Sequence, residues 1–180
     1  PSLRVGACVS TESSDAGAFY TGGQGGTAFW NGRGSLLLGN TFRNVRNEGY
    51  DGLNDHDHIS NQAVYLDDQM SGWTMENNSF HNCQVATFVG GGRDVKMVGN
   101  YCEDTDTCVH IDDRGLGWES SMCNCSSGPS CDPAAVYTLL HESAARAEWL
   151  RRFPEMAGAV PTSKGGERMC APFNNTVGGN

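Results

Sequence analysis

Short stretches in which apolar and polar residues alternate recur along the chain, and three of them align without gaps. They start at positions 63, 86 and 108, which are 23 and 22 residues apart, and have the sequences Ala-Val-Tyr-Leu-Asp-Asp, Ala-Thr-Phe-Val-Gly-Gly and Cys-Val-His-Ile-Asp-Asp. A fourth stretch, Ala18-Phe-Tyr-Thr-Gly22, fits the same register 45 residues before Ala63. Alternation over so few residues predicts short, half-buried strands.

A second series lies between these stretches and has the form Asn-x-apolar, at Asn40, Asn78 and Asn100. The end of the chain, Val177-Gly-Gly-Asn180, has the start of the same pattern. Two strand series with one regular period predict a solenoid in which each coil gives one strand to each of two sheets. The expected fold is therefore all-β, a single right-handed parallel β-helix domain over residues 1–180. The three asparagines are expected to stack as a ladder at a corner and to tolerate left-handed backbone there.

The alternation also assigns faces, because successive side chains of a strand point to opposite sides. The inward positions are predicted to be Val64, Leu66, Thr87, Val89, Val109 and Ile111. The outward positions form two columns, one with Tyr20, Tyr65, Phe88 and His110, the other with Asp67, Gly90 and Asp112. An outward column of aromatic rings beside acids is unusual for a surface that only faces water.

Two segments break the repeat and are predicted to be insertions. Residues 47–61 form a loop, and residues 118–170 form a longer, helical and disulfide-containing insertion. Within the second, the run from Ala134 to Met156 has a rough helical stripe. Its apolar positions are Val136, Leu139, Leu140, Ala147, Leu150 and Phe153.

Composition agrees with this picture and narrows the function. The 24 glycines among 180 residues suit short strands joined by tight corners. A net charge of −9 argues against nucleic acid or an anionic membrane as partner. The sequence has no starting Met, no signal peptide and no apolar run long enough to insert into a membrane. We therefore expect a mature or trimmed fragment of a longer protein, with further β-helix coils or another chain at its open ends.

Eight cysteines and three glycosylation sequons together favour a secreted, extracellular glycoprotein of a eukaryote. Four cysteines flank the irregular segment and lack the spacing of a zinc site, so they are the predicted disulfide partners: Cys123, Cys125, Cys131 and Cys170. Cys83, Cys102 and Cys108 lie in strand-like stretches, where small buried hydrophobic residues are at least as good an interpretation. The sequon asparagines are Asn77, Asn124 and Asn174.

The candidate catalytic groups are the aspartates at the ends of the repeated stretches. Asp67 and Asp112 take the same position two coils apart, which predicts a separation of about 9 to 10 Å, with Gly90 leaving a gap between them. Paired carboxylates with room for a water and a sugar ring fit glycoside hydrolysis, near the inverting spacing. Asp68 and Asp113 are one position further on, flank Gly91 in the same way, and could replace Asp67 and Asp112. The competing interpretation is a pair of solvated turn aspartates.

The outward aromatic column is the candidate sugar platform. Tyr20, Tyr65 and Phe88 could stack on a sugar ring, or could simply pack under a loop. His110 could contact substrate, act as acid or base with Asp112, or be a surface histidine. Arg93 and Arg114 could hold the carboxylate of an acidic sugar, but pairing with Asp94 and Asp113 is the favoured interpretation.

Metal binding is the weakest candidate. Alternate residues of an extended strand would place His56 and His58 on one face, where calcium or another metal could bind. A solvated acidic loop is the preferred interpretation, so no metal or other cofactor is expected. The glycines at 90–92 lack the Lys-Ser/Thr and the helix of a phosphate loop.

Several motifs resemble a large group of secreted right-handed parallel β-helix repeat proteins. They are the segments 15–22, 63–68, 89–94 and 110–118, and Glu148-Trp-Leu-Arg-Arg-Phe-Pro-Glu-Met156, which is similar to that group's inserted helix. The group is similar to carbohydrate-active families such as glycoside hydrolase family 141, with activities on α-L-fucosides and xylan. The resemblance implies two aspartates on the β-helix face as acid and base, at Asp67 or Asp68 and at Asp112. The extra cysteines, Asp113 and the short chain depart from the group's pattern.

The leading hypothesis is a secreted glycoside hydrolase that acts on a plant- or algal-type polysaccharide. The alternative is a non-catalytic extracellular β-helix that serves as a scaffold, adhesion or filament module, since uncapped strand edges invite stacking. A polysaccharide lyase ranks last, because the chain has only 12 basic residues and few of them are near the aspartates.

Overall fold

The computed structural model describes residues 4–6, 15–22, 32–47, 60–119, 145–158 and 171–179. Twelve strands in these ranges form three four-stranded parallel sheets. Sheet A contains β1 (Arg4–Gly6), β4 (Thr41–Arg43), β7 (Ser79–His81) and β10 (Tyr101–Glu103). Sheet B contains β2 (Ala16–Gly22), β5 (Asn61–Asp67), β8 (Val85–Gly90) and β11 (Thr107–Asp112). Sheet C contains β3 (Leu36–Leu38), β6 (Thr74–Glu76), β9 (Lys96–Val98) and β12 (Thr176–Gly178).

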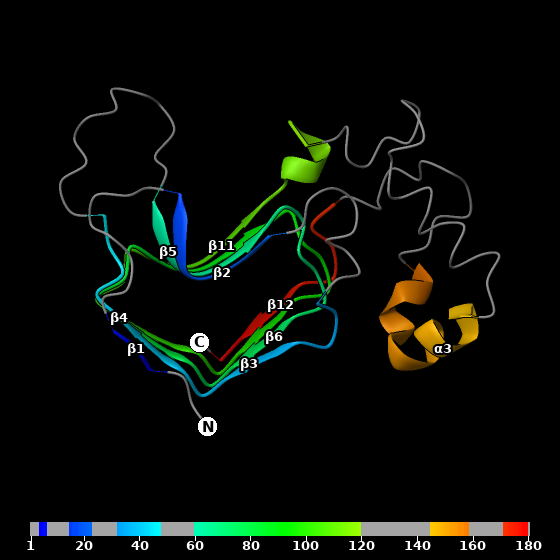
Figure 1. Cartoon of the computed structure of the whole chain (residues 1–180), viewed down its shortest axis with the longest axis horizontal. Coiled ribbons are helices and arrows are strands. Elements are labelled where there is room, and N and C mark those ends of the chain that lie inside the picture. Colours follow the sequence, from blue (N-terminus) through cyan, green and yellow to red (C-terminus); the bar gives the residue numbers. More distant parts are fainter. Residues whose placement is uncertain are drawn as a thin grey trace.

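Neighbouring strands of a sheet are three strands apart in the chain, and consecutive strands belong to different sheets. The strands of each sheet lie one behind another in Figure 1, and the three sheets surround a common interior. The all-β class with parallel pairing is thus confirmed. The sequence predicted two sheets, and the structure has three, because each Asn-x-apolar segment contains two short strands with the asparagine at the corner between them.

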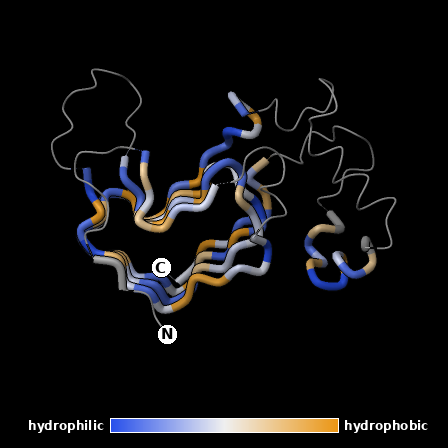
Figure 2. The backbone as a smooth tube through the Cα atoms, in the orientation of Figure 1, coloured by the Kyte–Doolittle hydropathy of each residue, from blue (hydrophilic) through white to orange (hydrophobic). Residues whose placement is uncertain are grey.

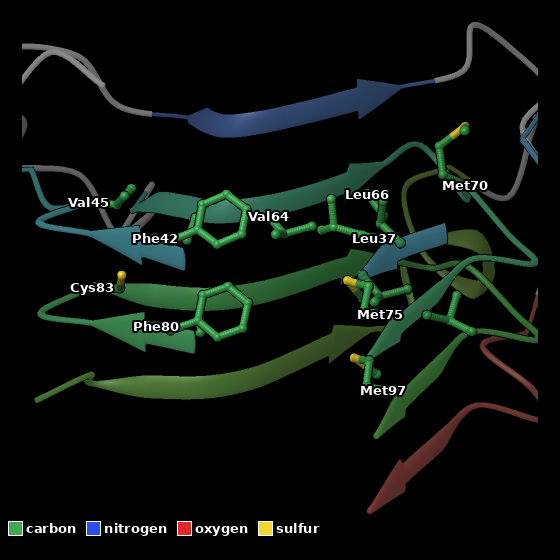
Figure 3. Packing of buried hydrophobic residues seen from close by; sticks show 14 residues of the cluster. Leu37, Phe42, Val45, Val64, Leu66, Met70, Met75, Phe80, Cys83 and Met97 are labelled. Carbon is green, nitrogen blue, oxygen red and sulfur yellow. The ribbon is translucent and has the colours of Figure 1, made fainter. Parts of the chain in front are cut away.

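The interior is apolar and contains side chains from all three sheets. Figure 2 shows hydrophobic and hydrophilic positions interspersed along the strands. Side chains at one register position stack from strand to strand, as Figure 3 shows for Phe42 and Phe80, whose rings are stacked with centroids 5.2 Å apart. The predicted inward residues of sheet B are confirmed. Val64, Leu66, Thr87 and Val89 are buried, while Val109 and Ile111 of the outermost strand are partly buried against the same cluster.

The predicted asparagine ladder is present and fully hydrogen-bonded. The Oδ1 of Asn78 accepts from the backbone and side-chain nitrogens of Asn40, both at 2.9 Å. The Oδ1 of Asn100 accepts from the same two groups of Asn78 at 3.1 and 2.9 Å. The left-handed residue is the one before the ladder position, such as Asn77 with φ 54°, so the ladder asparagines themselves do not adopt it. The ladder matters for the site because it fixes the register between neighbouring strands.

Helical structure follows β11. A 3-10 turn, η2 (Arg114–Leu116), continues directly from that strand, and α3 (Ala145–Arg152) and η4 (Pro154–Gly158) come later. The helix and η4 lie within the predicted 134–156 run and its end, but residues 134–144 are outside the described ranges. Leu150 and Phe153 pack on the buried Met156 as the stripe predicts, whereas Ala147 is exposed. None of the described helices has the length and apolar character needed to cross a bilayer.

The disulfide that the structure describes joins Cys102 and Cys108, across the turn from β10 to β11. The interpretation of these two cysteines as small buried hydrophobic residues is therefore wrong. Cys102 takes the register position of Phe42 and Phe80, so on the outermost strand of sheet A a covalent link stands where the inner strands have an aromatic ring. Cys83 is free and buried, as expected. Cys123, Cys125, Cys131 and Cys170 lie outside the described residues.

Candidate functional site

The outward aromatic column of sheet B forms as the register predicts. Tyr20, Tyr65, Phe88 and His110 are paired neighbours on β2, β5, β8 and β11. Tyr65 and Phe88 are stacked at 4.9 Å between ring centroids, Phe88 and His110 at 4.5 Å, and Tyr20 meets Tyr65 edge-on at 5.3 Å. Tyr65 is only 4% exposed because its neighbours cover it, and Phe88 is partly buried, so the most accessible rings are Tyr20 and His110 at the two ends of the column.

Two residues further along each strand, a second outward column contains Gly22, Asp67, Gly90 and Asp112 in register order. The two glycines are needed for close approach. A Cβ at Gly22 would lie 2.6 Å from the Tyr20 hydroxyl, and a Cβ at Gly90 would lie 2.5 Å from the Arg114 guanidinium carbon. Because these glycines have no side chain, Tyr20 can cross over Gly22 and Arg114 can cross over Gly90 to reach the carboxylate of Asp67.

Both oxygens of Asp67 are engaged by those side chains. The Tyr20 hydroxyl donates to Oδ2 at 2.8 Å, and Nη1 of Arg114 donates to Oδ1 at 2.5 Å. Burial, first, and the hydrogen bond to Asp67, second, raise the pKa of Tyr20 well above its usual value. Tyr20 thus stays a neutral donor, and the side chain of Asp67 is fixed at both oxygens.

Arg114 occupies the space between Asp67 and Asp112. Its Nε donates to both oxygens of Asp112 at 2.8 and 3.1 Å, and its backbone N–H donates to Oδ1 at 3.2 Å. The prediction of an empty gap at Gly90 is therefore wrong: the guanidinium fills it, because η2 turns Arg114 back over the glycine. Burial alone would lower the pKa of Arg114, but its contacts with Tyr65 and Asp112 outweigh this and raise it. Arg114 does not form the predicted pair with Asp113 among the described ion pairs.

Glu119 is the buried member of this group of side chains. Its side chain has no exposed area, and it lies 3.5 Å from Arg114 Nη1 while accepting from Nε2 of Gln69 at 3.1 Å. Burial, followed by a hydrogen bond between the carboxyl groups of Glu119 and Asp68, raises the pKa of Glu119 to about 7. Burial is also the main cause of a raised pKa at Asp68. We call Arg114, Asp67, Asp68, Asp112 and Glu119 the Arg114 cluster.

Only part of the Arg114 cluster reaches solvent. The side chains of Asp68 and Asp112 are 27% and 25% exposed, compared with 13% for Asp67. Trp118 is 72% exposed, and its ring centre lies 5.4 Å from the Arg114 guanidinium carbon. Together with Tyr20 and His110, it gives the partly exposed carboxyl groups an aromatic border. Arg114 also lies 5.2 Å from the centre of the Phe88 ring.

Arg93 belongs to a different part of the molecule. It is 3% exposed, its Nε lies 3.2 Å from Asp94 Oδ2, and its guanidinium packs on the ring of Phe173. Asp94 also pairs with Arg33, which in turn reaches Glu155 of η4 at 3.1 Å. We call Arg33, Arg93, Asp94 and Glu155 the Arg33 cluster. The pairing of Arg93 with Asp94, the favoured structural interpretation, is what the structure shows.

The other candidates are placed as follows. Asn77 is exposed, and Asn174 is exposed with its amide donating to Asp94 at 2.9 Å. Asn124, His56 and His58 lie outside the described ranges, as do most of the predicted insertions at 47–61 and 118–170. Within the described residues, no group of three His, Cys, Asp or Glu side chains could hold a metal ion.

Sequence reasoning missed two members of this site, Glu119 and Trp118. Both follow the repeat by only a few residues, in a segment expected to be the start of an insertion. The signal that could have found them is the sequence Asp-Arg-Gly-Leu-Gly-Trp-Glu after β11, where glycines on both sides of Leu116 permit a tight turn back over the sheet. In a comparison with known proteins, no protein family, curated protein or solved structure matches the chain.

Proposed function

We propose that the three sheets are the faces of a right-handed parallel β-helix and that the chain is a secreted glycoside hydrolase acting on a plant- or algal-type polysaccharide. Two features of the fold support the solenoid. Chain order passes from sheet to sheet, and the same register columns recur on successive strands of sheet B. The motif resemblance to secreted carbohydrate-active β-helix proteins agrees with this proposal.

One observation carries the enzymatic proposal: the carboxyl groups of one site lie in two different electrostatic environments. Asp67 and Asp112 each form an ion pair with the Arg114 guanidinium, at 2.5 and 2.8 Å. Burial raises the pKa of Asp68, and burial together with a hydrogen bond to Asp68 raises the pKa of Glu119 to about 7, which favours a protonated carboxyl group at this part of the site. A glycosidase needs this combination, a carboxylic acid beside a carboxylate.

The exposed members of each pair are the proposed catalytic residues. Asp68 donates its proton to the glycosidic oxygen as the bond from that oxygen to the anomeric carbon breaks. Asp112 accepts a proton from the water whose oxygen bonds to the anomeric carbon. The sum is one bond hydrolysed by one water, with the proton on Asp112 returning through solvent to Asp68. Asp67, with both oxygens engaged, is a positioning residue, and Tyr20, His110 and Trp118 provide stacking surfaces for sugar rings.

Hydrolysis assays on fucosylated and xylan oligosaccharides test this proposal. We expect Asp68→Asn and Asp112→Asn each to lower kcat/KM by at least about 100-fold, the usual contribution of an acid or base. Asp113→Asn is the matched control, because Asp113 is exposed, adjacent to Asp112 and makes no side-chain capping bond to η2. Equal activity in the wild type and in Asp112→Asn would overturn the assignment.

A second candidate function, a non-catalytic extracellular scaffold, is favoured by one specific observation. On the outermost described strands, core-facing residues such as Val109, Ile111 and Val177 are only partly covered or exposed. Such a surface suits stacking on further β-helix coils or on another chain. Mass measurement in solution and glycan binding separate the two functions: concentration-dependent self-association without glycan binding favours the scaffold, and a monomer that cleaves glycans excludes it.

A further inference from the structure

The turn that follows each strand of sheet C has a left-handed residue at its first position. These residues are Gly39, Asn77, Gly99 and Gly179, with φ angles of 64°, 54°, 65° and 64°. Glycine adopts this backbone without strain, whereas asparagine is only tolerated there. Asn77 is the one member of the column with a side chain, and it begins the sequon Asn77-Asn78-Ser79. We infer that Asn77 carries an N-linked glycan at the corner between β6 and β7.

The inference rests on one part of the proposed function, secretion, and not on glycoside hydrolysis. The sugar donor for such a modification is an oligosaccharide on a lipid pyrophosphate. Nδ2 of Asn77 forms a bond to C1 of the first sugar, and the bond from C1 to the pyrophosphate oxygen breaks. Nδ2 loses one proton as the lipid pyrophosphate leaves with its negative charge. The product is a glycosylated amide that keeps one N–H.

The folded structure has room for a sugar on Asn77, which is exposed. A Cβ at Gly99 would lie 2.7 Å from Asn77 Oδ1, so the amide oxygen occupies space that Gly99 leaves free. The amide group is planar and carries its nitrogen on the side opposite the oxygen, so Nδ2 is directed away from Gly99. At Gly39, the neighbour on the other side, nothing lies within 4 Å of the place that a Cβ would take. The column itself therefore puts no side chain in the way of a sugar on Nδ2.

The other described sequon, Asn174-Asn175-Thr176, provides a contrast. Asn174 is also exposed and left-handed, with a φ of 59°. Its Nδ2 donates to Asp94 Oδ1 at 2.9 Å and so ties the C-terminal segment to the Arg33 cluster. This bond explains an asparagine at that turn without a glycan. At the turn of Asn77, the glycines of the same column show that the backbone does not require an asparagine.

The backbone of the sequon is held in the folded sheets, and this determines when the glycan is attached. The Asn77 N–H donates to the Val98 carbonyl at 3.2 Å, and the Asn78 N–H donates to Asn100 Oδ1 at 3.1 Å. Asn78 is only 1% exposed, so a transferase cannot enclose the three residues once these bonds have formed. Val98 is 21 residues after Asn77 and is synthesised on the order of 1 to 4 s later, at about 5 to 20 residues per second. The glycan is therefore added during synthesis, before β9 pairs with β6.

A glycan at this corner leaves the Arg114 cluster open. Asn77 joins β6 of sheet C to β7 of sheet A, whereas the Arg114 cluster lies at the outer face of sheet B. In Figure 1 the corner where sheets A and C meet lies across the interior from sheet B. One molecule can thus carry the glycan and bind a ligand at the Arg114 cluster.

Peptide mass mapping of the full chain, secreted from eukaryotic cells behind an added signal peptide, tests the inference. Peptide-N-glycosidase F in heavy-oxygen water converts a glycosylated asparagine into a labelled aspartate. We expect the label at Asn77 in most wild-type molecules, its loss in Ser79→Ala, and its retention in Ser79→Thr, which keeps the sequon. Asn77→Gly has the residue of the neighbouring turns and should be secreted without a label at this position. An unlabelled Asn77 in the secreted wild type, or a label that persists in Ser79→Ala, would overturn the inference.

A second measurement tests the order of events. The folded chain, made without glycan and then mixed with membranes that supply the transferase and the lipid-linked sugar donor, is expected to stay unmodified, whereas a peptide of residues 74–82 is modified. Equal modification of the folded chain and the peptide would refute attachment before pairing. Neither measurement needs a substrate, so the two proposals fail separately. A labelled Asn77 in a chain that hydrolyses no glycan supports this inference and counts against the glycosidase, and a bare Asn77 in an active hydrolase does the reverse.

Discussion

The Arg114 cluster and the Arg33 cluster use the same side-chain chemistry with opposite results. The Arg33 cluster has two guanidinium groups and two carboxyl groups, and the side chains of Arg33, Arg93 and Asp94 are 1 to 3% exposed. The Arg114 cluster has one guanidinium and four carboxyl groups, and two of these carboxyl groups are about one quarter exposed. Charge balance with burial produces a structural cross-link, whereas charge imbalance goes with raised pKa values at two carboxyl groups, Asp68 and Glu119.

The position of each cluster agrees with this difference. The Arg33 cluster joins the turn at 33 to the turn at 94 and to η4, and Asp94 also binds Asn174 of the C-terminal segment. The Arg114 cluster lies at the ends of β5 and β11, beside the exposed rings of Tyr20 and Trp118. Only the second cluster combines ionisable groups with a surface that a ligand can reach.

Replacement of Arg114 is expected to have the largest effect. In Arg114→Gln four carboxyl groups lose the one cation that pairs with them among the described residues, and we expect a loss of about 4 kcal/mol in the free energy of unfolding at pH 8. The loss should be smaller at pH 4, because the pKa values of Asp68 and Glu119 are raised and these two groups, once protonated, no longer need the cation. Urea denaturation at the two pH values measures both. A loss that does not depend on pH would contradict the charge-imbalance account.

Replacement of Asp94 tests the balanced cluster. Asp94→Ala leaves two buried guanidinium groups without their shared carboxylate, and we expect a loss of about 3 kcal/mol. This loss should be nearly the same at pH 5 and pH 8, because arginine stays charged throughout that range. Asp94→Asn, which keeps an acceptor oxygen, should lose less. Strong pH dependence in either variant would show that the two clusters do not differ as proposed.

Glu119→Gln tests the Arg114 cluster through the direction in which the free energy of unfolding changes with pH. The pKa of Glu119 is raised from its usual 4.5 to about 7, so its contribution to stability is fully present below pH 4.5 and is lost as the pH rises through about 7. Relative to Glu119→Gln, the wild type should lose up to about 3 kcal/mol over this window and no more above it. Thermal or urea unfolding between pH 4 and pH 8 measures the difference. If the wild type instead gains stability relative to the variant as the pH rises, the pKa of Glu119 is not raised.

Replacement of Gly90 is expected to have the smallest effect on stability. In Gly90→Ala the new methyl group would lie 2.5 Å from the Arg114 guanidinium carbon, so the guanidinium must move, at a cost of about 2 kcal/mol. Gly178→Ala is the matched control, because Gly178 also ends a strand and nothing lies within 4 Å of a Cβ there. We expect the control to stay within about 0.5 kcal/mol of the wild type. Equal effects in the two variants would argue against a guanidinium seated over Gly90.

The sequence by itself determined the strand register, since side chains alternate strictly and a slip of one residue would turn the whole core outward. From that register came the aromatic column ending at His110, the placement of Asp67 and Asp112 in one column, and the asparagine ladder. These are local consequences of a repeat, and every copy reinforces them.

Only the tertiary structure decided which side chains pack on the outer face of sheet B. Gly90 leaves a gap in the sequence pattern, but the turn η2 places Arg114 in it, and Glu119 follows Arg114 into the interior. Such contacts join residues outside the repeat to residues within it, so no periodicity encodes them, and the electrostatics of the site depend on them because a carboxyl group's proton affinity is set by its neighbours in space.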